Sequence, residues 1–239
     1  MLDAILRAAG YTVGRFTSPH LIDLNERFLV NGEPIANEAL DEQIDFFRTI
    51  ADAREWWPPT FFEMTTVIAF RWFDQREVDC AIIEVGLGGR FDATNIITPE
   101  AVAITNIELD HTKYLGDTLP EIAFEKAGII KPGRPVVVGE TKPEPRDVIL
   151  ARAAEMDAPV RLMGRDFTYE LSGPPETLEF SFETPLVKLG PTPLGLVGRF
   201  QGHNAAIAVT LALDLVPRYP KITAKAIETG LREVCWPCR

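Results

Sequence analysis

Cysteine and histidine are scarce in this sequence, which has three of each among 239 residues. The cysteines Cys80, Cys235 and Cys238 are odd in number and provide no disulfide framework. Cys235 and Cys238 have the CxxC spacing of redox and metal sites, but no second cysteine pair accompanies them, so we interpret the spacing as incidental. A GxSxG motif is also missing, which gives no support for a hydrolase triad.

Long apolar runs and an excess of positive charge are missing too. No stretch is apolar for long enough to cross a bilayer, and no signal peptide is recognisable. The net charge of −11 argues against general binding to nucleic acid or anionic membranes. Glycine loops and helix N-termini can still bind phosphate in an acidic protein. We therefore expect a cytoplasmic protein with reduced thiols that acts on small molecules.

The order of apolar segments predicts an α/β fold. Segments with helical spacing alternate with short apolar runs, which indicates a mostly parallel sheet with helices on both faces. Residues 167–197 are rich in β-formers, proline and glycine, so we expect a small β-rich annex there. The predicted strands cover residues 11–16, 79–85, 101–106, 136–138 and 159–162. The predicted helices cover 2–9, 37–54, 60–73, 118–130, 146–156, 205–216 and 223–234.

Four local motifs mark where helices begin or end and where the chain turns. The TFFE motif at 60–63 and the TLPE motif at 118–121 are capping boxes, which begin helices. Asn31-Gly32 lies between apolar runs and indicates a hairpin or turn. The WWPP motif at 56–59 is expected to end the preceding helix.

The most informative stretch is EVGLGGRFDATN at residues 84–95. It follows the apolar run CAII, which is typical of a buried parallel strand. In open α/β sheets, ligands bind at the carboxyl ends of strands. A glycine-rich loop can approach a ligand closely with its backbone, and Glu84 can hold a cation there.

His111 follows the next predicted strand, as Glu84 follows the one before it. If the two strands are neighbours, both side chains meet at one edge of the sheet. A carboxylate and an imidazole there can bind Mg²⁺, which uses few protein ligands and keeps waters and phosphate oxygens. Alternatively, His111 is a structural histidine beside Asp110. His20 either lines a cleft or holds a loop in place.

These motifs resemble those of folylpolyglutamate synthase and dihydrofolate synthase, members of the Mur ligase superfamily. The resemblance covers nearly the whole chain, and the TSPHL and LGGRFD motifs favour the folate branch over ligases that act on cell-wall precursors. It implies ATP-dependent addition of L-glutamate to dihydropteroate or folates through an acyl phosphate. Besides residues 84–95, the matching motifs are TSPHL at 17–21, NER at 25–27, TFFE at 60–63, TNIELDH at 105–111, LGDT at 115–118, EKAGI at 125–129 and QGHNA at 201–205.

The resemblance implies roles for five residues in the ATP chemistry. Glu84 and His111 match metal ligands for Mg²⁺. Lys126 matches a lysine that is carbamylated in similar enzymes, although a lysine on a helix is otherwise a solvated surface residue. Gln201 and Asn204 match positions near the adenine of ATP, and the alternative for both is a helix cap.

Four further residues match positions that hold the pterin ring, namely Thr60, Phe62, Asp92 and Ala93. An aromatic face can stack on the flat ring, and a carboxylate can accept hydrogen bonds from its N–H groups. The alternative for Phe62 is packing in the core. The alternative for Asp92 is a carboxylate that caps a loop.

The resemblance also predicts which part of such an enzyme this sequence covers. Similar enzymes carry a phosphate loop upstream of the first helix, whereas no GxxxxGK[ST] pattern occurs in these 239 residues. We expect residues 1–235 to form an incomplete central ATP-binding domain and 236–239 a stub of a linker to a C-terminal domain. The isolated chain is then expected to be inactive, and the full-length enzyme a monomer. Two alternatives are another Mur-type ligase and a non-catalytic pterin-binding remnant.

Overall fold

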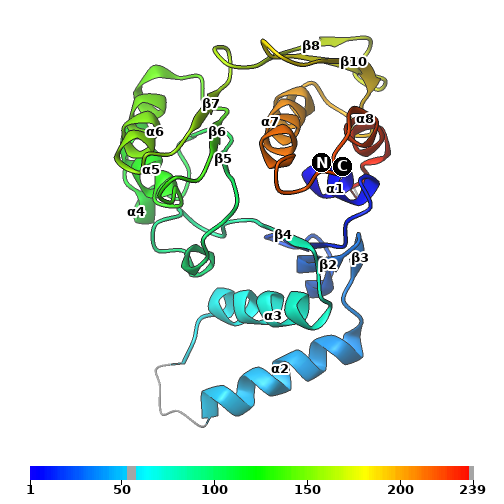
Figure 1. Cartoon of the computed structure of the whole chain (residues 1–239). Coiled ribbons are helices and arrows are strands. Elements are labelled where there is room, and N and C mark those ends of the chain that lie inside the picture. The colour runs from blue at the N-terminus through cyan, green and yellow to red at the C-terminus, as the bar shows by residue number, and fades with distance from the viewer. Residues whose placement is uncertain (53–57, 237–239) are drawn as a thin grey trace. The chain divides into compact units, whose positions relative to one another are not determined.

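The computed structural model describes residues 1–52 and 58–236 (Figure 1). The chain divides into two compact units. Unit 1 contains Met1–Gly10, Gly88–Phe91 and Ile97–Arg239, and unit 2 contains Tyr11–Leu87 and Asp92–Ile96. The predicted helix end near residue 54, the two tryptophans of the WWPP motif and Cys238 lie outside the described residues.

Unit 2 is a four-stranded sheet with two helices, α2 and α3. In the order β3-β2-β1-β4, β1 runs parallel to β4 and antiparallel to β2, and β2 pairs with β3. The hairpin predicted at Asn31-Gly32 is confirmed, since both residues have positive φ angles, 54° and 86°. The elements are β1 (Val13–Phe16), η1 (Leu24–Arg27), β2 (Phe28–Val30), β3 (Glu33–Pro34), α2 (Asn37–Asp52), α3 (Phe61–Gln75), β4 (Cys80–Ile83) and η2 (Ala93–Ile96).

Both predicted capping boxes are confirmed. At α3, the Thr60 Oγ accepts a hydrogen bond from the Glu63 N–H at 3.2 Å, and the Glu63 carboxylate accepts one from the Thr60 N–H at 2.7 Å. Thr118 and Glu121 form the same reciprocal pair at the start of α5. These pairs satisfy backbone N–H groups that have no partner within the helix, which is why the helices begin at these residues.

Unit 1 contains a parallel sheet in the order β5-β6-β7 with helices on both faces. Figure 1 shows α5 and α6 on one side of this sheet and α7 on the other. Val136, Val137 and Val138 in the central strand are fully buried, as expected for a strand covered on both faces. The elements are β5 (Val102–Ile104), α4 (Thr112–Leu115), α5 (Leu119–Ala127), β6 (Val136–Val138), α6 (Pro143–Glu155) and β7 (Val160–Leu162).

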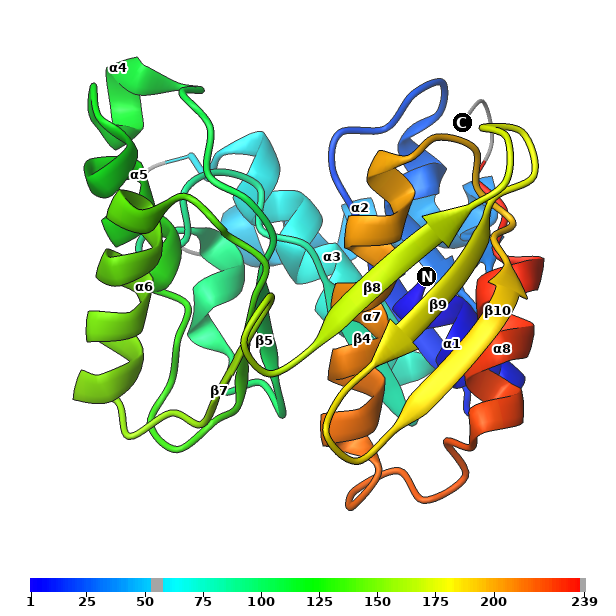
Figure 2. The ribbon, with the colours of Figure 1, turned by 90° about the horizontal axis from the view of Figure 1, so that it is seen from above.

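The predicted β-rich annex is a three-stranded antiparallel sheet in unit 1, in the order β10-β9-β8. Side chains alternate along β9, so Phe180 and Phe182 are buried while their neighbours are not. Figure 2 shows this sheet lying over α7, α1 and α8. The elements are α1 (Leu2–Ala8), β8 (Thr168–Ser172), β9 (Glu179–Glu183), β10 (Lys188–Pro193), α7 (Phe200–Leu215) and α8 (Ala224–Glu233).

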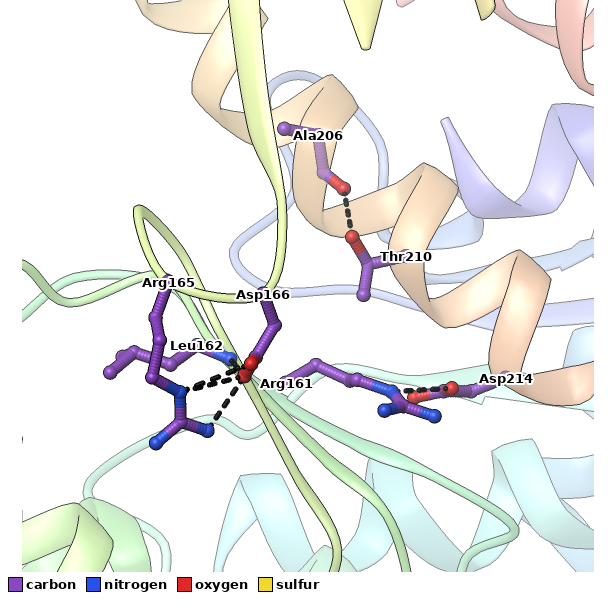
Figure 3. Close-up of polar contacts among 7 residues, drawn as sticks. All are labelled: Arg161, Leu162, Arg165, Asp166, Ala206, Thr210 and Asp214. Carbon is purple, nitrogen blue, oxygen red and sulfur yellow. Dashed lines mark hydrogen bonds and ion pairs between the residues drawn. The ribbon is translucent and has the colours of Figure 1, made fainter. Parts of the chain in front are cut away.

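Two arginine–aspartate pairs hold the chain where it passes from β7 to β8 (Figure 3). The Asp166 carboxylate accepts the Leu162 N–H at 2.8 Å and pairs with Arg165 at 2.7 Å. The hydrogen bonds from Arg165 are the main reason why the pKa of Asp166 is lowered. The Arg161 Nε donates to Asp214 of α7 at 2.9 Å, which ties this strand to that helix.

The predicted α/β class is correct, but the parallel strands do not form one sheet. Among the described residues, β4 pairs with β1 while β5 pairs with β6, so β4 and β5 are not neighbours. The condition under which Glu84 and His111 would meet at adjacent strand ends is therefore not met. Strand pairing depends on contacts between distant segments, which the order of apolar runs does not specify.

Two helices begin earlier than their apolar spacing predicts. The helix expected at 146 begins at Pro143, because proline fits the first helical turn, and the helix expected at 205 begins at Phe200.

Within the described ranges, no helix is both long enough and apolar enough to cross a membrane.

Candidate functional site

Asp92 joins the two parts of the glycine-rich segment that belong to unit 2, up to Leu87 and from Asp92 onward. One carboxylate oxygen accepts the N–H groups of Gly86 and Leu87, each at 3.0 Å, and the other accepts the N–H of Thr94 at 2.9 Å and its hydroxyl. Asp92 is only 9% exposed. Both oxygens are thus engaged by the chain itself, which is the loop-capping arrangement that the sequence left open for this residue.

The other three residues predicted at the pterin ring also lie in unit 2. Phe62 is half-buried and lies 5.7 Å from the Phe16 ring between centroids. Its ring covers Gly86, where a Cβ atom would collide with the ring and force it to shift. Thr60 is exposed as the cap of α3, and Ala93 is the first residue of η2.

Glu84 is exposed at the end of β4 and holds the TSPHL segment in unit 2. Its carboxylate accepts the Ser18 N–H at 3.0 Å. Nearby, Arg27 is 7% exposed and donates its Nε–H to the His20 Nδ1 at 2.9 Å. Burial lowers the pKa of Arg27, and the charge of Glu84 opposes this shift. His20 therefore holds a loop in place, one of its two predicted roles.

His111 lies in unit 1, at the residue before α4. Its backbone is left-handed, with a φ angle of 52°, and its side chain is 56% exposed. The neighbouring Asp110 accepts the His111 N–H at 2.7 Å, and its carboxylate lies 3.6 Å from the ring Nε2. The imidazole is accessible and has a carboxylate beside it, an arrangement common among metal-binding histidines.

Lys126 lies in the last turn of α5, against the glycine-rich loop, and is half-buried. A Cβ atom at Gly89 would lie 2.9 Å from the carbonyl oxygens of Glu125 and Lys126, so glycine is required for this close approach. Arg90 follows in the loop, pairs with Glu125 at 3.8 Å and lies 3.9 Å from the centre of the Phe124 ring. Loop and helix therefore pack as one piece within unit 1.

Gln201 and Asn204 lie inside the first turns of α7, which begins at Phe200. The Asn204 Nδ2 donates to the Gln201 Oε1 at 3.1 Å, and Gln201 is 6% exposed. The N-cap residue is Arg199, and its side chain forms no capping hydrogen bond. The alternative of a helix cap is therefore wrong for both amides, while Asn204 remains exposed to a ligand.

Sequence reasoning missed a buried carboxylate that shapes the site in unit 1. Glu140 follows β6 and is 2% exposed. It accepts hydrogen bonds from the N–H groups of Ile107 and Lys142. The pattern that singled out Glu84, a carboxylate directly after an apolar strand, also occurs in VVVGE at 136–140 and could have identified it.

Comparisons with known proteins identify relatives along the whole chain, although no family model matches. The dihydrofolate synthase/folylpolyglutamate synthase of Bacillus subtilis is 40% identical over 100% of this chain and 57% of its own length. The folylpolyglutamate synthase of Lacticaseibacillus casei is 37% identical over 98% of the chain and 56% of its own length. The chain is homologous to folylpolyglutamate and dihydrofolate synthases. It spans a little over half the length of these two relatives.

Solved structures of such synthases have the same fold as this chain. The structure titled "FPGS-AMPPCP-folate complex" matches with a TM-score of 0.94 and 36% identity, over 100% of this chain and 60% of that one. The structure titled "E.coli FolC in complex with DHPP and ADP" matches with a TM-score of 0.85 and 35% identity, over 100% of this chain and 54% of that one. These matches confirm the fold class that was predicted for this chain from its resemblance to the synthases.

In the described parts of the chain, no three histidine, cysteine, aspartate or glutamate side chains gather as a metal-binding group. Glu84 lies in unit 2 and His111 in unit 1. Each still offers a donor atom at its surface, since Glu84 and His111 are both exposed.

Proposed function

We propose that this chain is part of an ATP-dependent ligase that adds L-glutamate to dihydropteroate or to folates. The proposal rests on one observation, the 35–40% sequence identity to synthases of this kind along the whole chain. The titles of the solved relatives name an ATP analogue, ADP, folate and DHPP. These relatives extend beyond the aligned region, so the complete reaction is proposed for the whole protein.

The reaction has two steps. A carboxylate oxygen of the pteroate or folate attacks the γ-phosphorus of ATP, and ADP leaves. The amino group of glutamate then attacks the acyl phosphate, loses a proton and expels inorganic phosphate, which leaves an amide. Both steps gather negative charge on phosphate oxygens, and catalysis depends on fixed groups that offset it.

We propose Glu84 of unit 2 and His111 of unit 1 each as a ligand of Mg²⁺, whose positive charge would offset much of this negative charge when bound. The donor set fits the ion, because a carboxylate oxygen is the ligand that Mg²⁺ prefers and few protein ligands suffice. Both side chains are exposed, and Asp110 lies beside the imidazole. Glu84 also accepts the Ser18 N–H, which orients its carboxylate.

We propose that Thr60, Phe62, Asp92 and Ala93 form the pterin side of the site, all within unit 2. Since Asp92 already accepts four hydrogen bonds from the loop, its main contribution is to hold the loop that faces the ligand. Phe62 is half-buried and offers the accessible part of its ring for apolar contact with the pterin.

On the nucleotide side, we propose that Asn204 and Gln201 contact adenine and that Lys126 is carbamylated. The Asn204 amide is exposed and oriented by Gln201. Lys126 is half-buried, and its carbonyl oxygen lies against Gly89 of the glycine-rich loop. Residues 1–235 would then belong to the ATP-binding part of a monomeric cytoplasmic enzyme.

Calorimetric titration of the chain tests the substrate class. We expect saturable binding of dihydropteroate and none of a UDP-linked cell-wall peptide. Binding of the peptide alone would instead assign a ligase of cell-wall precursors, and binding of neither would refute the folate site. A parallel titration measures the affinity for MgATP. We expect this affinity to fall in Glu84→Gln and to stay unchanged in the control Glu38→Gln, which alters an exposed glutamate of the same unit.

A further inference from the structure

The loop that carries His111 is held by a buried carboxylate. Glu140 is 2% exposed and directs its two oxygens at different parts of the chain. The Oε2 accepts the N–H of Ile107, which lies four residues before His111, and the Oε1 accepts the N–H of Lys142 at 2.7 Å. One side chain at the end of β6 thus fastens the segment that follows β5.

Lys142 also binds the backbone of Ile107. Its Nζ donates to the carbonyl oxygen of Ile107 at 2.6 Å and to the Glu108 carboxylate at 2.6 Å. Ile107 is completely buried and lies beyond the end of β5, so no sheet partner serves its backbone. Buried backbone groups require partners, and here two side chains provide them.

A third contact reaches the start of this segment from α7. The His203 Nε2 lies 3.2 Å from the carbonyl oxygen of Thr105, and this nitrogen is the donor because a carbonyl only accepts. Gly139 allows the approach, since a Cβ atom there would lie 2.5 Å from the Thr105 oxygen. The segment 105–108 is therefore fixed from β6 and from α7.

We propose that Glu140 is a positioning residue, which sets the place of His111 by holding Ile107. The inference rests on the proposed role of His111 as a metal ligand. A buried carboxylate is costly unless it is hydrogen-bonded, and an apolar side chain would fill the same space. An apolar side chain would not satisfy the Ile107 N–H, and the start of α4 would then be free to shift.

Variants of the two holding residues separate this role from simple packing. Glu140→Ala removes both acceptors, whereas Glu140→Gln keeps one acceptor oxygen and much of the volume. Lys142→Met removes the contacts to Ile107 and Glu108 but keeps the backbone N–H that Glu140 uses. Glu144→Gln is the matched control, because Glu144 is an exposed glutamate close by in α6.

Two measurements on the 239-residue chain decide the question. Amide hydrogen exchange reports how firmly residues 105–111 are held. Mn²⁺ alone serves as the metal probe. Its paramagnetic broadening of the NMR signals of the His111 ring gives the Mn²⁺ affinity, which a purely structural role of Glu140 would leave unchanged.

We expect Glu140→Ala to speed exchange of the Ile107 amide by about 10- to 100-fold, as loss of a hydrogen bond to a charged acceptor predicts. Its Mn²⁺ affinity should fall about 10- to 100-fold, which is typical when the support of a metal ligand is lost. Glu140→Gln should show smaller changes in both measurements, and Glu144→Gln none. Should Glu140→Ala be unfolded, Glu140→Gln and Lys142→Met decide by the same two measurements.

Folded variants with unchanged exchange at 105–111 would overturn the positioning role. Faster exchange with unchanged Mn²⁺ affinity would also overturn it, because the hold would then be structural only. If the unaltered chain shows no broadening at His111, the metal role in the proposed function is wrong. The exchange data would in that case still show whether Glu140 holds the segment.

Discussion

Replacement of Asp92 by Asn distinguishes a loop-holding carboxylate from a ligand-binding one. Asp92 is almost buried, and its four hydrogen bonds join Gly86 and Leu87 to Thr94 across the glycine-rich loop. Asparagine keeps the shape of the side chain but has one acceptor oxygen and a donor NH₂ group. Whichever way the amide is turned, its NH₂ group faces two donors of the chain.

The size of the effect follows from those contacts. A hydrogen bond to a charged group contributes about 1.5–3 kcal/mol, so the loss of two gives about 3–6 kcal/mol. Gly86 and Leu87 are exposed, so water can replace the acceptor that their N–H groups lose. Thr94 is buried, so its N–H and hydroxyl depend on the side chain at position 92 for an acceptor. The amide oxygen should therefore stay with Thr94, and the expected loss falls to about 2–4 kcal/mol.

Urea unfolding followed by circular dichroism measures this loss, and dihydropteroate titration measures binding on the same samples. Asp41→Asn serves as the control, because Asp41 is an exposed aspartate on α2 in the same unit. We expect the control to match the unaltered chain, and Asp92→Asn to lose both stability and binding. If Asp92→Asn loses binding but keeps its stability, the carboxylate serves the ligand directly and our reasoning about the loop is wrong.

Four further variants test the packing, a helix cap and an ion pair. Gly230→Ala should destabilise the chain by about 1–3 kcal/mol in thermal melts, because a Cβ atom there would lie 2.5 Å from the α1 backbone. Gly202→Ala meets only movable side chains and should cost less; equal effects would contradict this. Thr60→Ala should cost about 0.5–2 kcal/mol through loss of the α3 cap, and an unchanged melt would contradict it. The lowered pKa of Asp166 stabilises the fold above its unfolded value near 3.8, and this contribution disappears as the pH falls through the lower folded value. The stability gap between the unaltered chain and Asp166→Asn, under about 1 kcal/mol, should therefore close in strong acid, and a gap independent of pH would refute the assignment.

Features that depend on a few neighbouring residues were predictable. The capping boxes at Thr60 and Thr118 and the turn at Asn31-Gly32 are confirmed at the predicted residues. Each of them is decided by a side chain and by backbone groups within three residues of it. The β-rich annex is confirmed for a similar reason, since alternation along a strand is written in its own residues.

Features that join distant segments were not predictable. The apolar runs of β4 and β5 do not show whether these two strands belong to the same sheet. Only the folded chain assigns them to different sheets. The VVVGE pattern marks Glu140 as a candidate, but its role was not predictable because its partner Ile107 lies 33 residues away. A carboxylate acquires a role of this kind only when folding brings a backbone N–H to it.

The sequence by itself therefore determined the local starts of helices and turns, the α/β class and the family of relatives. The tertiary structure alone decided which strands pair, that Asp92 accepts four hydrogen bonds from its own loop, and that a buried glutamate holds the His111 segment. The physical reason is the range of the interactions. Propensities and caps act over one helical turn, whereas burial and hydrogen-bond satisfaction depend on residues that meet only after the chain has folded.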